Sequence, residues 1–282
     1  GNKSLGFYTT NNGQISIVNM DGTIKGGTSA SDRGTAFYVS GNGINSTNIA
    51  SAADIENLLT ASGITINGLR LNMESGSRLF TLGNVSLNLS AVEGINTTGF
   101  SSMTVNGSDY KTILLHKGLL NIDKDVNLDD ANSDYSKIET ANSSMVNNSV
   151  MTGSGNGITA MAQANAKDLP KSTVTLLNNG TINLAGDESI GIYADYGIIQ
   201  NNGNIETSGT NSYGIYGVNG TEVTTDAAST IKAGTNGAGV VLQSYVTDPT
   251  TGAIVRSNYG DGTFKLDHNG KITLTGTKVF GI

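Results

Sequence analysis

Cysteine and tryptophan are absent from this 282-residue sequence, and proline occurs only twice. Without cysteine the chain has no disulfide, no thiolate metal site and no cysteine nucleophile. Charged residues make up 14% of the chain, against about 25% in typical globular domains. Low charge and scarce proline, combined with abundant isoleucine, leucine and valine, exclude a disordered linker.

Clusters of positive charge are also missing. The formal net charge is -7 and no run of lysine or arginine occurs, so we expect no nucleic-acid partner, because a phosphate-binding surface needs clustered cations. No apolar stretch reaches the roughly 18 residues that a membrane-spanning helix requires. The chain opens with Gly-Asn-Lys-Ser rather than a signal peptide, and we expect it to be an excised segment of a longer protein.

Glycine is abundant, with 38 residues, about twice the usual share. Asparagine, threonine, serine and branched aliphatic residues dominate the remainder. This composition is typical of an all-β protein with many short strands and tight turns.

A repeated unit is the strongest signal in the sequence. NNGTINLAGDESIGIYA begins at Asn178 and NNGNIETSGTNSYGIYG begins at Asn201, 23 residues later. Three partial copies, beginning at Asp21, Ala228 and Asn269, keep an isoleucine followed 8 to 10 residues later by a glycine. The five isoleucine–glycine pairs are Ile24 and Gly34, Ile182 and Gly191, Ile205 and Gly214, Ile231 and Gly239, and Ile272 and Gly281.

Each unit contains a turn signal followed by short alternating strands. One short strand cannot bury its apolar face alone, but stacked units place equivalent isoleucines over one another in a continuous core. Asn-Gly turns also allow antiparallel hairpins, but hairpins predict mirrored pairing, whereas these units repeat in the same direction. The sequence therefore predicts a right-handed parallel β-helix, a single coil over residues 1–282 that continues beyond both ends.

Side chains in equivalent slots support this alignment. Glu206 and Lys232 would form an opposite-charge pair across neighbouring strands. Asparagine side chains before the turn glycine can form an amide ladder, at Asn179, Asn202 and Asn269. Tyr193 and Tyr216 share an outward slot, which Val241 occupies in the next unit.

Three segments interrupt the coil in our interpretation: residues 42–75, 157–172 and 244–263. In the first, the sequence from Ser51 predicts a short helix that Ser51 or Asp54 caps and Gly63 ends. Its apolar face consists of Ile55, Leu58 and Leu59. Further along, residues 82–89 alternate as a strand does. The second interruption is predicted to be an alanine-rich loop.

The third interruption, residues 244–263, is predicted to be a protruding hairpin around the turn at 248–252. Binding residues tend to collect on loops carried by a rigid scaffold, although a tolerated decoration fits this sequence equally well. Candidate ligand-contact residues are Tyr245, Asp248, Arg256, Tyr259, Tyr193 and Tyr216.

Catalytic and metal-binding chemistry is not indicated. His116 and His268 lie in unrelated units without a serine-elbow or HExxH motif, so we expect no triad, zinc site or cofactor. Asp123, Asp125, Asn127 and Asp134 have a calcium-loop-like spacing, but Leu128 stands where that loop needs glycine, which favours the acidic outer face of a strand. A polysaccharide-cleaving β-helix enzyme is a remaining alternative, although carboxylates are not visibly paired at Asp187, Glu188, Asp226 and Asp248.

The NNGxIxxxGxxSxGIY units resemble passenger repeats of large type V autotransporters, and particularly of fusobacterial outer-membrane autotransporter adhesins. The resemblance implies a β-helical stalk displayed outside the cell and anchored by a C-terminal β-barrel that lies outside this sequence. It implies attachment to host cells or other bacteria, with a surface glycan or protein as partner. The alternative is a passive spacer that holds a distal head away from the membrane. The shared repeat is structural and carries over no binding residue.

Overall fold

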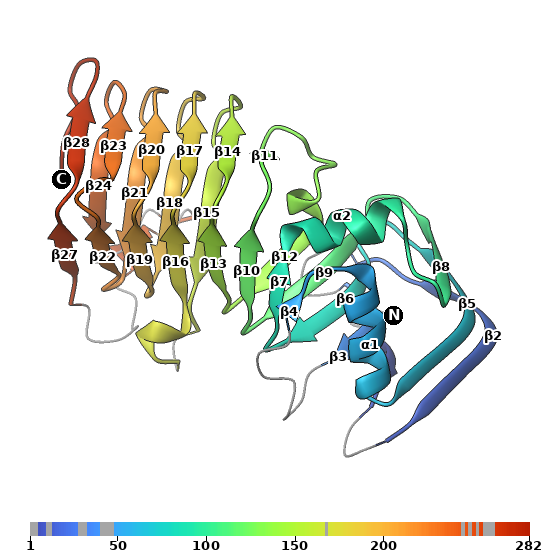
Figure 1. Cartoon of the computed structure of the whole chain (residues 1–282). Helices are drawn as coiled ribbons and strands as arrows, with labels where there is room; N and C mark the ends of the chain where they lie inside the picture. The colour runs from blue at the N-terminus through green and yellow to red at the C-terminus, as the bar shows by residue number, and fades with distance from the viewer. Residues whose placement is uncertain are drawn as a thin grey trace. The chain divides into compact units, whose positions relative to one another are not determined.

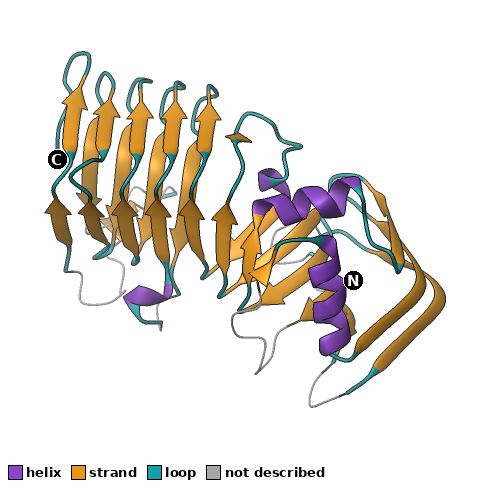
Figure 2. Cartoon of the chain, in the orientation of Figure 1, coloured by secondary structure: helices purple, strands orange, loops and turns teal. Residues whose placement is uncertain are grey.

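The computed structural model describes residues 5–9, 13–27, 33–39, 48–166, 169–243, 246–247, 250–251, 254–255 and 263–282. Strands make up most of this part of the chain (Figure 2), and apart from one antiparallel pair they form parallel sheets. The chain is therefore mostly β, which is compatible with the predicted all-β parallel fold. The chain divides into two compact units. Unit 1 comprises Gly1–Leu120 and Asn132–Thr140, and unit 2 comprises Asn121–Ala131 and Ala141–Ile282. A single coil over residues 1–282 stays a prediction.

Unit 2 is built from successive triplets of short strands (Figure 1). In chain order they are β13 (Ser144–Asn147), β14 (Val150–Gly153) and β15 (Thr159–Ala164); β16 (Thr175–Asn178), β17 (Thr181–Leu184) and β18 (Ile190–Asp195); β19 (Ile198–Asn201), β20 (Asn204–Thr207) and β21 (Tyr213–Val218); β22 (Glu222–Thr225), β23 (Thr230–Ala233) and β24 (Ala238–Gln243). A short β11 (Val126–Asn127) precedes them, and β27 (Lys265–His268) and β28 (Lys271–Leu274) follow.

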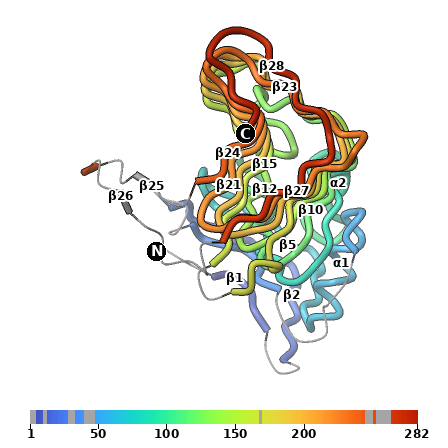
Figure 3. The backbone as a smooth tube through the Cα atoms, turned by 90° about the vertical axis from the view of Figure 1, so that its left-hand side faces the viewer, coloured from blue at the N-terminus to red at the C-terminus, as the bar shows by residue number. Residues whose placement is uncertain are grey.

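Each strand of a triplet pairs in parallel with the corresponding strand of the next triplet. For example, β16 pairs with β19, β17 with β20 and β18 with β21. The traces of successive triplets consequently follow the same path in the view of Figure 3. The alternative prediction, that these repeats pair as antiparallel hairpins, is therefore wrong.

The predicted isoleucine column is present in unit 2. Ile205 lies opposite Ile182 on one side and Ile231 on the other, and Ile231 lies opposite Ile272. Ile182, Ile205 and Ile231 are fully buried. Equivalent side chains from consecutive strands thus form the core that no single strand could make.

The glycine that follows each isoleucine is required by the same column. A Cβ atom at Gly191 would lie 2.7 Å from the Cγ2 atom of Ile205. At Gly214 it would lie 2.5 Å from the Cγ2 atom of Ile231. Contacts this short are excluded by sterics, so the isoleucine of one triplet occupies the space that a side chain at the preceding glycine would need.

Unit 1 also contains parallel strands, of which β2 and β5 have 10 residues each, longer than any strand of unit 2. One sheet has the order β1 (Leu5–Tyr8), β3 (Thr35–Val39), β6 (Arg78–Gly83), β9 (Lys111–His116) and β12 (Ile138–Ala141). A second sheet has the order β2 (Ile15–Ile24), β5 (Ile64–Met73) and β8 (Met103–Gly107). Short strands β4 (Asn48–Ile49) and β7 (Ser86–Asn88) also pair in parallel. The chain first passes from unit 1 to unit 2 within β10 (Leu119–Ile122), and the segment Asn132–Thr140 belongs to unit 1 again.

An aromatic column forms part of the core of unit 1. The rings of Phe7 and Phe37 stack with centroids 5.2 Å apart, and those of Phe37 and Phe80 stack at 5.4 Å. Phe37 and Phe80 are fully buried. The in-register pairing of β1, β3 and β6 therefore stacks equivalent phenylalanines in a column, as the triplets of unit 2 stack equivalent isoleucines.

The predicted helix is confirmed as α1 (Ala52–Ala61). Ser51 is the N-cap, and its Oγ accepts from the backbone N–H of Asp54 at 3.3 Å. The Asp54 carboxylate accepts from the N–H of Ala50 at 2.9 Å and from the hydroxyl of Ser51 at 2.9 Å, so the two side chains bond to backbone groups at the start of the helix. The buried residues are Ile55, Leu58 and Leu59, as predicted, and Gly63 adopts a positive φ of 82° beyond the helix end.

Three sequence interpretations are corrected. The predicted strand over residues 82–89 is broken by Asn84, whose φ is 57°, so β6 ends at Gly83 and a second helix, α2 (Leu89–Thr97), follows β7. The interruption at 42–75 contains β5, which is a full member of the sheet with β2 and β8. The alanine-rich segment at 157–172 is not only loop, because β15 lies within it and pairs in register with β18; a 3-10 turn at Lys171–Thr173 ends the segment.

The hairpin predicted within 244–263 is supported by its two described arms. β25 (Val246–Thr247) and β26 (Ile254–Val255) pair in antiparallel fashion, with Val246 opposite Val255. The remaining positions of this segment lie almost entirely outside the described residues.

Candidate functional site

Three tyrosines gather on the outer side of the β15–β18–β21–β24 sheet, and we call this group the tyrosine face: Tyr193 on β18, and Tyr213 and Tyr216 on β21. Tyr193 and Tyr216 are register partners, and their rings stack with centroids 6.1 Å apart and an interplanar angle of 26°. Tyr213 meets Tyr216 edge-on at 5.4 Å. The three rings therefore form one continuous aromatic cluster.

The alternation of inward and outward side chains along β18 determines which residues contribute to the tyrosine face. Ile192 and Ala194 are buried in the core, so the intervening Tyr193 and the following Asp195 point outward. Burial, with smaller contributions from Asp195 and Tyr216, raises the pKa of Tyr193 to about 12. The hydroxyl of Tyr193 is therefore neutral at physiological pH.

Polar groups border the tyrosine face. The Nδ2 of Asn219 donates to Oδ1 of Asp195 at 2.6 Å, and the hydroxyl of Tyr216 donates to Oε1 of Gln243. Asn219 is only 2% exposed, so its amide is a fixed support for the carboxylate. An aromatic surface edged by a carboxylate and amides suits non-covalent binding of a partly apolar, hydroxyl-bearing ligand.

A lysine lies at the neighbouring corner. The Nζ of Lys171 lies 5.6 Å from the ring centroid of Tyr196 and 3.1 Å from a carboxylate oxygen of Glu222. Glu222 therefore neutralises the lysine, and the corner adds no net positive charge that would attract an anionic ligand.

Of the six predicted contact residues, the structure brings Tyr193 and Tyr216 together, and Val241 follows Tyr216 in the column as expected. The side chains of Tyr245, Asp248, Arg256 and Tyr259 lie outside the described residues. Sequence reasoning missed the remaining members of the site: Tyr213, Asp195, Asn219 and Gln243. The signal for Asp195 was its place two residues after Tyr193, which puts both side chains on the same side of the strand.

Two of the acidic positions considered as a calcium site accept hydrogen bonds from neighbouring groups of their own unit. Asp134 accepts a hydrogen bond from Nδ2 of Asn96 in unit 1 at 2.8 Å, whereas Asp125 accepts from the backbone N–H of Val150 in unit 2 at 3.0 Å. Within the described residues no group of three or more histidine, aspartate or glutamate side chains could hold a metal ion.

The two histidines belong to different units, His116 to unit 1 and His268 to unit 2. Nδ1 of His268 lies 2.7 Å from Oγ1 of Thr225, its register partner on β22. Burial, and secondarily the charge of Lys117, lowers the pKa of His116. Two of the carboxylates considered for catalysis accept hydrogen bonds from backbone groups: Asp187 from the N–H of Thr210 and Asp226 from that of Ala228.

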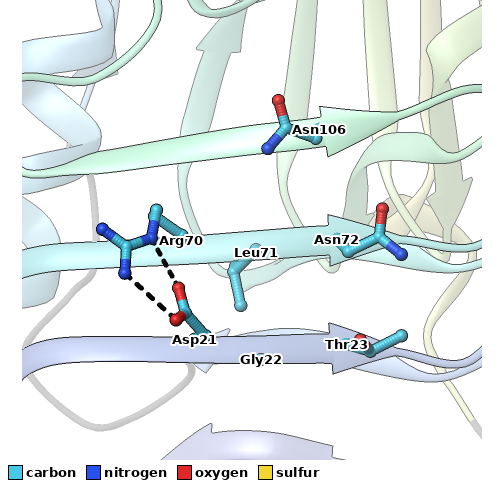
Figure 4. Close-up of a pocket in the computed structure, with 7 residues that line it drawn as sticks. All are labelled: Asp21, Gly22, Thr23, Arg70, Leu71, Asn72 and Asn106. Carbon is cyan, nitrogen blue, oxygen red and sulfur yellow. Dashed lines mark hydrogen bonds and ion pairs between the residues drawn. The ribbon is translucent and has the colours of Figure 1, made fainter.

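A groove also lies on the β2–β5–β8 sheet of unit 1 (Figure 4). Arg70 forms two bonds to the Asp21 carboxylate there, of 2.6 Å and 3.0 Å, and they lower the pKa of Asp21. Both side chains are about two-thirds exposed, so the pair is a solvated surface ion pair. The groove is lined by Asp21, Gly22, Thr23, Arg70, Leu71, Asn72 and Asn106.

Comparisons with family models, with curated proteins and with solved structures gave no match. In the part of the chain that the structure describes, neither helix is long and apolar enough to cross a membrane.

Proposed function

We propose that the chain is part of a right-handed parallel β-helix. Support comes from the triplets of unit 2, each of which pairs strand for strand and in register with the next. The coupling of each isoleucine to the glycine of the preceding triplet gives the sequence repeat a physical reason. In such a coil only inward positions are constrained by the repeat, so outward positions are available for recognition.

We further propose that this coil belongs to the passenger of a cell-surface type V autotransporter and acts as a non-catalytic adhesin. The partner is a glycan or protein on a host or bacterial cell. The observation that carries this proposal is the tyrosine face. Its outward column holds Ala162, Tyr193, Tyr216 and Val241 in successive strands, so the fold itself does not require tyrosine there. Adjacent outward aromatic rings are typical of binding surfaces.

Attachment of the purified chain to host and bacterial cells tests this proposal. Replacing both Tyr193 and Tyr216 by serine should reduce attachment at least tenfold, and deletion of 246–260 tests the hairpin separately. Tyr8→Ser, at an exposed tyrosine of unit 1, is the matched control and should leave attachment unchanged. If the unaltered chain attaches to no cell, the spacer alternative is correct instead.

A further inference from the structure

The tyrosine column stops abruptly on one side. In register, Ala162 of β15 lies opposite Tyr193, and Ala164 lies opposite Asp195. Both alanines are exposed. Among the described residues, Tyr216 is the one aromatic ring that stacks on Tyr193, so the other face of the Tyr193 ring is bordered by two methyl groups. We call the surface formed by Ala162, Ala164, Tyr193 and Asp195 the alanine shelf.

The size of the shelf follows from sheet geometry. Neighbouring strands lie about 4.8 Å apart, and stacked rings prefer centroid separations of about 4.5–7 Å. The shelf therefore has room for one ring-sized group in the place that a third tyrosine would occupy at position 162. A larger side chain at 162 would fill the same volume.

The chemistry of the shelf selects the ring. The face of Tyr193 carries a negative π surface that attracts the C–H edge or face of a ligand. Asp195 receives the hydrogen bond of Asn219 on Oδ1, and in the described part of the chain Oδ2 accepts none, so it can accept from a ligand O–H or N–H. A carboxylate offers no donor and repels anions, and the whole chain carries a net charge of -7.

We propose that the alanine shelf is a subsite for one neutral sugar residue of a glycan. The sugar stacks its C–H face on Tyr193 above Ala162, and a hydroxyl or amide donates to Asp195. This deepens the proposed adhesive function and rests on it. Acidic sugars, such as sialylated or sulfated ones, are excluded by the carboxylate.

The test is binding of the full chain to an array of neutral, sialylated and sulfated oligosaccharides, followed by titration of the neutral glycans that bind. Ala162→Tyr fills the shelf with a third ring and should weaken binding at least tenfold without lowering the urea midpoint. Asp195→Asn should also weaken binding at least tenfold. Tyr193→Ser removes the stacking ring and should weaken binding at least tenfold.

Ala185→Tyr is the matched control, because Ala185 is also an exposed alanine of unit 2 but lies outside the tyrosine face, and its binding should be unchanged. Retained binding in Ala162→Tyr, or a preference for acidic glycans, would overturn the shelf. Cell attachment without binding to any neutral glycan would also overturn the shelf while leaving the adhesive function standing. Absence of both cell attachment and glycan binding would defeat the two proposals together.

Discussion

At the residue scale, the repeat is explained by a pair of residues rather than by either one alone. Gly214 and Gly239 lie opposite one another in neighbouring strands, and a Cβ at Gly214 would lie 2.6 Å from the carbonyl oxygen of Gly239 as well as 2.5 Å from Ile231. Glycine is therefore needed at this slot because of close packing, without any requirement for a positive φ. This contact explains why isoleucine and glycine recur at a regular spacing along the sequence.

Gly214→Ala should consequently destabilise unit 2 by about 1–3 kcal/mol, since backbone or core must shift to admit the methyl group. Gly94→Ala is the control: it lies inside α2 and nothing lies within 4 Å of its added Cβ. That substitution should stabilise the chain by about 1 kcal/mol through helix propensity. Urea unfolding of both variants measures the difference, and equal effects would contradict the packing explanation.

At the scale of elements, strands are joined by two asparagine ladders as well as by backbone hydrogen bonds. In the buried ladder, Asn147 donates to Asn178 and Asn178 donates to Asn201, each at 2.8 Å, which joins β13, β16 and β19. The predicted exposed ladder joins Asn179 to Asn202 at 3.0 Å. It does not extend to Asn269, which bonds to Asp267 instead.

Asn178→Ala and Asn179→Ala separate the contributions of the two ladders. The first leaves the amide of Asn147 and the carbonyl of Asn201 buried without their partner, and each such group costs about 1–3 kcal/mol. The second should cost less than about 1 kcal/mol, because water replaces the lost bonds of an exposed amide. Denaturant unfolding of these adjacent substitutions provides the measurement. A cost for Asn179→Ala as large as that for Asn178→Ala would show that the ladders do not differ by burial.

At the scale of the whole molecule, each unit holds a tyrosine whose protonation is linked to folding. Burial raises the pKa of Tyr135 in unit 1 and that of Tyr193 in unit 2. An unfolded chain releases these protons near pH 10, whereas folded Tyr193 holds its proton until about pH 12. The stability contributed by the neutral form is therefore complete below pH 10 and is lost as the pH rises from about 10 to 12.

Tyr193→Phe should accordingly move the midpoint of alkaline unfolding to higher pH, since phenylalanine has no proton to lose. Circular dichroism follows the loss of structure, and tyrosinate absorbance follows ionisation. If the midpoint of Tyr193→Phe equals that of the unaltered chain, ionisation of Tyr193 does not limit folding at high pH.

The sequence by itself determined the parallel register of the regular repeats, the isoleucine column, the Glu206–Lys232 ion pair, observed at 2.9 Å, and helix α1. These features follow from local periodicity, because each regular repeat carries its own alignment. Helix α2 was missed because the alternation of residues 82–89 continues into its first residue, and only the backbone turn at Asn84 separates them.

Only the tertiary structure decided which residues meet across irregular spacings. Ala162 lies opposite Tyr193, 31 residues away (193 minus 162), instead of the 23 residues that separate Tyr193 from Tyr216 (216 minus 193). In unit 1, the carboxylate of Glu139 accepts hydrogen bonds from Arg33, which is 106 residues away, and from Arg78, which is 61 residues away. An insertion changes the interval without changing the pairing, since strands align by burial and hydrogen bonding rather than by sequence distance. The alanine shelf and the cluster of Arg33, Arg78 and Glu139 therefore could not be predicted from the sequence and were found only in the folded structure.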